Sequence, residues 1–530
     1  MWHIRTPLLL VSMGLACGAS LLAQTGARDA QIRRQAHDAD TLAWWHRTEQ
    51  LANDTMAGRE PGTAAYDRAA LLVANEFKAA GLEPAGEAGT FFQPVPLLKL
   101  DLDPAGTEFH VERPGTASLP LRSLEQIAVR LGPQTPASFR APLVWAGYCE
   151  AAQLADASAA GLLAGAIAVC FRPHLGHADP GSNAALLKAH VAAVMWVDDP
   201  SEPLEPPRWP LPAARVVTLA QDTSAAGTGP ALLTLRLNWE ALPSVLQGSQ
   251  HTAQELLAAA RTHAPSPSFA MNTTLAAHLH ITTQRFTASN VLAVLPGTSK
   301  TGEYLAVSAH LDGYGRGEPI GGDAIYNGAL DDAAYVALLE QLAARQHAQG
   351  FARSVLFCAF TAEEEGLLGS EWFTQHPTVP GIVADINLDQ LRPLFPLRIL
   401  TTLAVDDSTL GGVVRAVAAA RHVEVRADRE PERGLLHRSD HWPFMQTGVP
   451  AVGFIFGYDP GTEAESRYRT WYRVQYHRPQ DDLAQPIDFR AARDFNAFFY
   501  ALVAKVADDP ARPTWLPAGA NDHPATPGAF

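Results

Sequence analysis

The run YLAVSAHLD at residues 304–312 is an apolar stretch that ends in a histidine and an aspartate. Its first six residues have the length and composition of a buried strand. Similar runs follow at Val355 to Phe360, Ile382 to Leu388 and Ala451 to Phe456, and a helical pattern extends from Asp332 to about Gln349. Strands that alternate with long helices predict an α/β fold, with a mixed, mostly parallel central sheet flanked by helices.

Other parts of the chain have a different character. From about Leu98 to His263, short apolar runs are separated by turns rich in proline and glycine, which predicts a separate, mostly β module. Helical spacing recurs from Tyr66 to Gly81 and from Phe489 to Lys505, whereas the last residues show no periodicity. We therefore expect a signal peptide at 1–23, the first part of the main domain at 24–110, an inserted module at 111–265, the rest of the main domain at 266–507 and a loose tail at 508–530.

The first residues predict export. An apolar stretch from Pro7 through Leu22 follows a short basic start and ends at Ala23, a small residue suited to cleavage. This stretch is too short for a comfortable membrane span, so a signal peptide is the better interpretation. We expect the mature protein to be periplasmic or extracellular.

The mature chain would keep three cysteines, which allows one disulfide at most. Cys149 and Cys170 lie in the same segment and could pair in an oxidising compartment. Cys358 lies inside an apolar strand-like run, so we expect a small buried hydrophobic side chain there.

The charge of the chain bears on its partners. The formal net charge is -15 and no long run of lysine or arginine is present, which argues against a nucleic-acid partner. Apart from the first residues, no segment has the pattern of a membrane span.

Acidic residues and histidines follow one predicted strand after another. Taken singly, each has an ordinary explanation: an aspartate before a helix caps it, and adjacent glutamates fit a solvated turn. Independent surface charges have no reason to gather at the carboxyl ends of one sheet, where α/β proteins place their sites. Close carboxylates also repel unless a cation neutralises them. The pattern predicts a metal site from His310, Asp312, Asp331, Asp332, Glu363, Glu364, Glu365, Asp389 and His477.

These residues resemble the motifs of a known family, the di-zinc exopeptidases of peptidase family M28. That family includes bacterial secreted aminopeptidases and the relatives of glutamate carboxypeptidase. The similar motifs are SAHLD at 308–312, NGALDD at 327–332, AEEEGLLGS at 362–370, NLD at 387–389 and YH at 476–477, together with the segments 57–81 and 439–451.

The resemblance implies two zinc ions, bridged by Asp331 and by a water or hydroxide. The other implied ligands are His310, Glu364, Asp389 and His477. Three carboxylates and a hydroxide would balance the charge of two divalent cations, and mixed nitrogen and oxygen ligands suit zinc.

The resemblance also implies roles around the metals. Glu363 matches the general base that moves a proton from water to the departing amine. Asp312 would orient His310. His441 occupies the position where some relatives place a tyrosine that polarises the substrate carbonyl.

The chain departs from the family pattern at two positions. Tyr335 replaces the usual glycine after the bridging aspartate, and Gln390 replaces a common methionine after Asp389. Neither change removes a ligand. The middle module resembles a protease-associated domain, most clearly at 141–148 and 161–170.

The expected function is hydrolysis of peptides by an exopeptidase, with aminopeptidase as the leading alternative. A carboxypeptidase or dipeptidase would need a cationic clamp for the substrate carboxylate, for which Arg316, Arg392 and Arg438 are candidates. A binding protein that keeps the fold without the metals is a third alternative.

Overall fold

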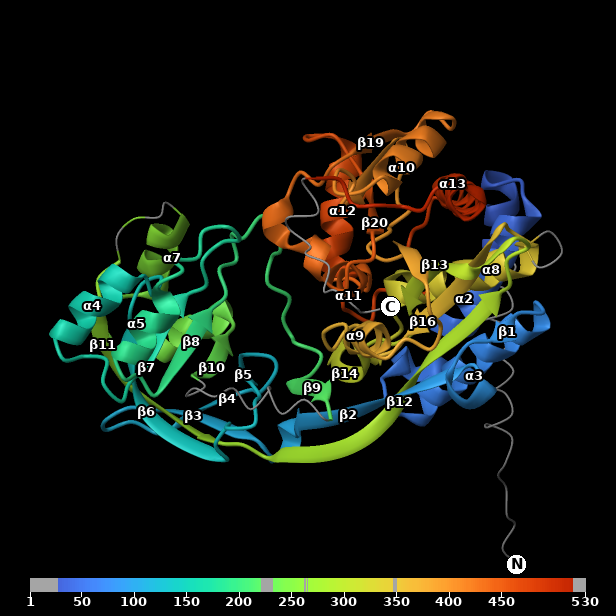
Figure 1. Cartoon of the computed structure of the whole chain (residues 1–530). Coiled ribbons are helices and arrows are strands. Elements are labelled where there is room, and N and C mark those ends of the chain that lie inside the picture. Colours follow the sequence, from blue (N-terminus) through green and yellow to red (C-terminus); the bar gives the residue numbers. More distant parts are fainter. Residues whose placement is uncertain (1–26, 221–231, 262–263, 265, 347–349, 518–530) are drawn as a thin grey trace, which may run out of the picture.

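The structure is a computed structural model that describes residues 27–220, 232–261, 264, 266–346 and 350–517. The predicted signal peptide and residues 518–530 of the predicted tail lie outside these ranges. Figure 1 shows two bodies that are joined by a pair of long strands, β2 and β12. None of the helices in the described ranges combines the length and the apolar character needed to cross a membrane.

The first body is built on a ten-stranded sheet with the order β19-β18-β20-β17-β13-β16-β12-β2-β9, in which β1 also pairs with β12. The strands β20, β17, β13 and β16 are parallel to their neighbours within that group, whereas β12, β2 and β9 are antiparallel. The predicted α/β fold with a mixed sheet is therefore confirmed. The strands are β1 (Glu83–Pro84), β2 (Phe92–Leu102), β9 (Arg215–Leu219), β12 (Ile281–Leu295), β13 (Lys300–His310), β16 (Arg353–Phe360), β17 (Ile382–Asn387), β18 (Ile399–Leu403), β19 (Glu424–Arg426) and β20 (Ala451–Gly457).

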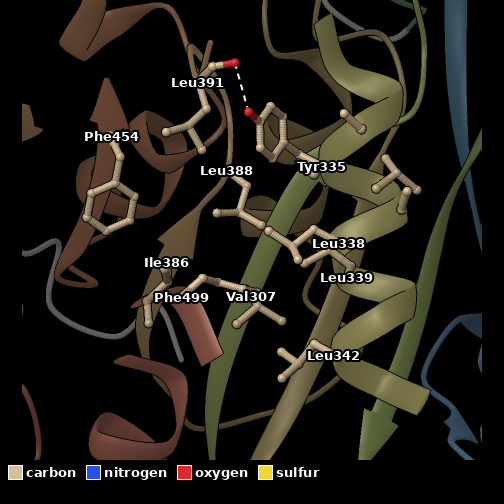
Figure 2. Close-up of a cluster of buried hydrophobic side chains, with 14 of the residues drawn as sticks. Val307, Tyr335, Leu338, Leu339, Leu342, Ile386, Leu388, Leu391, Phe454 and Phe499 are labelled. Atoms are coloured by element: carbon tan, nitrogen blue, oxygen red, sulfur yellow. Dashed lines mark hydrogen bonds between the residues drawn. The ribbon is translucent and has the colours of Figure 1, made fainter. Parts of the chain in front are cut away.

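Side chains alternate across this sheet, so each strand contributes to two cores. On β16, for example, Phe357 belongs to a large cluster with helices on one face, and Cys358 belongs to a smaller cluster on the other. Figure 2 shows the large cluster, where Val307 of β13 and Ile386 of β17 pack with Leu338 of α8 and Phe499 of α13.

Helices lie on both faces of the sheet. The large cluster includes residues of α2 (Ala39–Ala52), α3 (Ala64–Ala79), α8 (Ala334–Gln346), α10 (Leu410–Ala419), α12 (Glu463–Val474) and α13 (Phe489–Asp508). The smaller cluster includes residues of α9 (Leu368–Gln375) and α11 (His441–Gln446). A short hairpin, β14 (Gly315–Ile320) and β15 (Asp323–Tyr326), follows β13.

The second body has an eight-stranded sheet with the order β4-β3-β11-β6-β7-β8-β10-β5. A disulfide joins Cys149 and Cys170 in this body, whereas Cys358 is buried and free, as predicted. Its strands are β3 (Glu108–Glu112), β4 (Leu119–Leu121), β5 (Ile127–Arg130), β6 (Ser138–Trp145), β7 (Ile167–Phe171), β8 (Ala193–Val197), β10 (Leu233–Leu237) and β11 (Phe269–His278). Its helices are α4 (Ala151–Ala159), α5 (Ser182–Lys188), α6 (Leu242–Leu246) and α7 (Ala253–Arg261).

The chain passes between the two bodies more than once. Strand β9 lies inside the predicted insert 111–265, yet it pairs with β2 at the edge of the first sheet. Strand β11 lies after residue 265, yet it pairs with β3 and β6 of the second sheet. The short apolar pattern of a strand shows that it is buried but does not show in which sheet, which explains both differences.

Part of the predicted loose tail is also held in place. Trp515 forms a β-bridge with Ser408, and its indole Nε1 donates a hydrogen bond to the main-chain oxygen of Gly448 at 2.8 Å. A single aromatic anchor leaves no periodic signal in a segment rich in proline and alanine, so the sequence pattern did not indicate this contact.

Candidate metal centre

The predicted ligands are brought together by parallel strands that end at the same edge of the first sheet. His310 is the last residue of β13, Glu364 follows β16, and Asp389 follows β17. These three strands are neighbours, with β13 in the centre, so their carboxyl ends lie side by side. Asp331 approaches from the single helical turn Ala329–Ala333 that precedes α8.

Asp331 lies between the two histidines. Its Oδ1 is 3.5 Å from Nε2 of His310, and its Oδ2 is 3.4 Å from Nε2 of His477. The same nitrogen of His477 is 3.2 Å from Oε2 of Glu364. Each oxygen of Asp331 thus faces a different imidazole, which is the arrangement that a bridging carboxylate requires.

Two groups of side chains have ligand atoms that all lie within 4.8 Å of one another. One consists of His310, Asp331 and Glu364, and the other consists of His310, Asp332 and Asp389. The second group contains Asp332 where the prediction has Asp331. Both groups share His310, so the side chains that could hold a metal ion lie next to one another at this edge.

Burial sets the electrostatics of the centre. Burial raises the pKa of Glu364 well above its usual value, and the charge of Asp331 raises it further. Burial alone would raise the pKa of Asp331 too, but the charge of Arg392 and the two nearby imidazoles hold it well below its usual value. Burial lowers the pKa of His477 to about 4, so its imidazole is neutral at pH 7 and can offer a lone pair.

Glu363 lies beside the predicted ligands without belonging to either group. Its Oε2 is 3.9 Å from Nε2 of His310, and its side chain is almost fully buried. The carboxylate of Asp312 accepts hydrogen bonds from the main-chain amides of Glu363 at 3.0 Å and Glu364 at 3.3 Å. Asp312 therefore holds the turn that carries both glutamates, in addition to any effect on His310.

The contact between Asp312 and His310 is mainly through the backbone. Nδ1 of His310 is 3.3 Å from the main-chain oxygen of Asp312 and 3.8 Å from its carboxylate. Asp389 is held from another side, because the hydroxyl of Ser439 donates to its Oδ2 at 2.7 Å.

His441 lies apart from this group. Its ring is fully buried, its Nδ1 is 3.5 Å from Oδ1 of Asn387, and it lies against the backbone of Gly453. Burial lowers the pKa of His441 to about 3. An imidazole with no exposed surface cannot touch a substrate in this conformation, so the geometry favours a structural role.

Three residues at the centre were not predicted as contributors. The hydroxyl of Tyr314 lies 3.0 Å from Nδ1 of His477, and Nη2 of Arg392 lies 3.3 Å from Oδ1 of Asp331. Arg392 is fully buried, and its guanidinium lies 4.4 Å from the ring centre of Trp471. The sequence suggested Arg392 as a residue that binds the substrate carboxylate, but its guanidinium is paired with Asp331.

Arg59 is the third of these residues. It is fully buried and donates hydrogen bonds to four main-chain carbonyls. Leu311, which follows His310, accepts at 2.7 Å, and Gly328, which lies before Asp331, accepts at 3.0 Å. The other acceptors are Leu51 and Asn327. The side chain of Arg59 thus joins the two segments that carry His310 and Asp331. Both segments are far from Arg59 in the sequence, so no local sequence pattern indicates these contacts.

The comparisons with known proteins agree with this centre. Residues 290–503 match the model of peptidase family M28. This part of the chain is therefore similar to the peptidases of that family. All five predicted ligands and Glu363 lie inside the matched residues, so the predicted family resemblance is confirmed.

The relatives extend the comparison. A glutamate carboxypeptidase 2 homolog of Caenorhabditis briggsae is 25% identical over 272 residues, which cover 48% of this chain and 33% of that protein. The chain thus spans about a third of this curated relative. An aminopeptidase from Aneurinibacillus sp. strain AM-1 has a TM-score of 0.57 at 18% identity and covers 91% of this chain and 97% of its own. A zinc aminopeptidase from Bacillus subtilis gives a TM-score of 0.57 at 19% identity, covering 88% and 95%. At this identity the two structures support the fold of the chain.

The role of Arg59 leads to a prediction. Arg59→Met removes the donors to four buried carbonyls, each of which costs about 1–3 kcal/mol when left unsatisfied. We expect the free energy of unfolding, measured by urea denaturation, to fall by about 4 kcal/mol or more. Arg68→Met is the matched control, because Arg68 binds carbonyls on the exposed surface, and it should cost less than about 1 kcal/mol. A similar loss in both variants would contradict the role of Arg59.

Proposed function

We propose that the chain is a zinc-dependent exopeptidase of the aminopeptidase type that hydrolyses peptides. The observation that carries this proposal is the buried carboxylate of Asp331, whose two oxygens face two different histidines. The carboxylate of Glu363 lies beside one of these histidines, His310. The match to peptidase family M28 supports the peptidase activity, and the aminopeptidases among the similar structures favour action at the amino end.

The residues fit a metal centre. Oδ2 of Asp331 is buried and has no hydrogen-bond partner among the described residues, as expected of an atom reserved for a cation. A cavity of about 10 Å³ lies beside Asp331, Glu364 and His477, which is room for one ion or water. We propose two zinc ions, held by His310, Asp331, Glu364, Asp389 and His477, because three buried carboxylates need that much positive charge.

In the proposed reaction, Glu363 accepts a proton from water as the water oxygen bonds to the peptide carbon, and it passes this proton to the amine as the C–N bond breaks. Bound zinc would supply the Lewis acid that makes water nucleophilic near neutral pH. Asp312 holds the main chain of Glu363 and Glu364 in place through two hydrogen bonds. The carboxylate of Glu364 would then bind metal while that of Glu363 moves protons. Tyr314 fixes the ring of His477 through Nδ1, which leaves Nε2 for a metal.

We also propose that the protein is exported and that the second body is a protease-associated insert. The disulfide between Cys149 and Cys170 supports an oxidising compartment. If residues 1–23 are a signal peptide, sequencing of the exported protein should begin at Gln24. An exported protein that still begins with Met1 would contradict this cleavage.

Substrates with blocked ends test the direction of attack. We expect a tripeptide with a free amino terminus to be cleaved at its first bond and its N-acetylated form to be cleaved at least 100-fold more slowly. Mass spectrometry of the products identifies the bond. Release of the carboxyl-terminal residue from the acetylated peptide would instead support the carboxypeptidase alternative.

Removal of the proposed base tests the mechanism. Glu363→Gln keeps the shape of the side chain but cannot accept the proton, so kcat should fall by about 10²–10⁴-fold while zinc stays near two per chain. Zinc is measured by metal analysis after dialysis. Glu365→Gln is the control, since this neighbour faces Arg215 at 2.6 Å instead of the centre, and it should lose less than about tenfold. Full turnover in the first variant would exclude Glu363 as the base.

A further inference from the structure

A cavity of about 300 Å³ lies between the two bodies and reaches the candidate metal centre. Tyr314 and His477 line it from the first body. Most of its lining comes from the second body, above all from the segment 198–213 between β8 and β9. In Figure 1 this green segment runs across from the second body to the orange part of the first. The cavity therefore extends from His477, one of the proposed ligands, toward the second body.

The acidic side chains of this cavity are already engaged. Asp198 accepts from Arg236 at 2.7 Å and from the indole of Trp209 at 2.8 Å. Asp199 binds His174 at 3.0 Å. The remaining two are also occupied, because Glu202 accepts from main-chain amides and Glu205 pairs with Arg438 of the first body.

Arg208 differs from these residues. Its guanidinium lies over two aromatic rings, 4.9 Å from the centre of Tyr476 and 5.5 Å from that of Tyr472. Its Nη1 is buried and has no hydrogen-bond partner within the described ranges, and no carboxylate of those ranges forms an ion pair with it. Contact with the two rings holds the guanidinium in place without using its N–H donors.

The three arginines that the sequence suggested as clamps do not take this place. Arg392 is buried against Asp331, Arg438 is paired with Glu205, and Arg316 is exposed on β14 and lines a different hollow. Two other arginines line the cavity, but Arg236 is paired with Asp198 and Arg172 is exposed. Among the described residues, Arg208 is thus the arginine of this cavity that combines a buried donor with the lack of a carboxylate partner.

We propose that Arg208 binds a carboxylate of the substrate, one or two residues beyond the bond that is cleaved. Tyr476, on which Arg208 stacks, lies in turn on the ring of His477 with 3.6 Å between ring centres. Only the ring of Tyr476 therefore separates Arg208 from His477, a proposed ligand. Because one residue of extended peptide spans about 3.3–3.6 Å, the free carboxyl terminus of a short peptide fits the separation between the centre and Arg208. The inference rests on the proposed function, since it takes the candidate centre as the site of cleavage.

Binding to an inactive chain tests this directly. Calorimetry on the zinc-loaded Glu363→Gln protein would compare three probes: Leu-Gly, Leu-Gly amide and Leu-Asp amide. Leu-Gly should bind about 10–100-fold more tightly than Leu-Gly amide, as expected for hydrogen bonds between charged groups. Tight binding of Leu-Asp amide in place of Leu-Gly would assign Arg208 to an acidic side chain instead of the terminal carboxylate.

Substitutions then connect this preference to the residue. Adding Arg208→Met should bring the ratio between Leu-Gly and Leu-Gly amide close to one, and Arg208→Lys should keep part of it. Arg316→Met, the matched control, should keep the full ratio. The proposal is overturned if the chain with Arg208 intact does not distinguish the acids from the amide, or if Arg208→Met weakens all three probes equally.

The two proposals can fail separately. In the chain that retains Glu363, kcat/KM should show the same ratio between Leu-Gly and its amide. If neither peptide is hydrolysed while the calorimetric ratio still depends on Arg208, the exopeptidase proposal fails and the carboxylate site stands.

Discussion

Repulsion among buried carboxylates is the constraint on which the candidate centre depends. Asp331, Glu364 and Asp389 lie together at the ends of neighbouring strands, and burial makes their negative charge costly. The chain supplies part of the compensation itself, through Arg392 beside Asp331 and the Ser439 hydroxyl on Asp389. The proposed zinc ions would supply the remainder. Two of the proposed ligands, Asp331 and Asp389, are thus held in position by neighbouring groups that are not themselves proposed ligands.

The second body completes the surroundings of this centre. The edge strand of the first sheet contributes as well, because Arg215 of β9 pairs with Glu365, the third glutamate of the triplet, and with Glu60 of the loop that carries Arg59. Glu205 pairs with Arg438 from the other side of the cavity. These polar contacts thus connect the edge strand β9 and the cavity-lining segment 198–213 to the loops that carry the proposed ligands.

Much of the centre could be predicted from the sequence because its residues follow strands that end at one edge. His310, Glu364 and Asp389 are local to their strands, so a correct strand pattern places them together. The contributions of Arg59, Tyr314 and Arg392 could not be predicted this way. Arg59, for instance, binds the carbonyls of Leu311 and Gly328, more than 250 residues away, and no spacing rule connects positions so distant. His441 shows the converse, since a motif suggested a role in the reaction, whereas packing buries its ring against Asn387 and Gly453.

Strand β9 has a consequence for how this protein could have been assembled. The chain leaves the first sheet through β2, folds much of the second body, and comes back to pair with β2 before leaving again. The second body is therefore not an accessory that can be cut out at two points. Its excision would strip the outermost strand from the main sheet and bare the edge of β2 from Leu97 to Asp101, inviting association with other chains. Any ancestor without the second body needed another way to protect that edge.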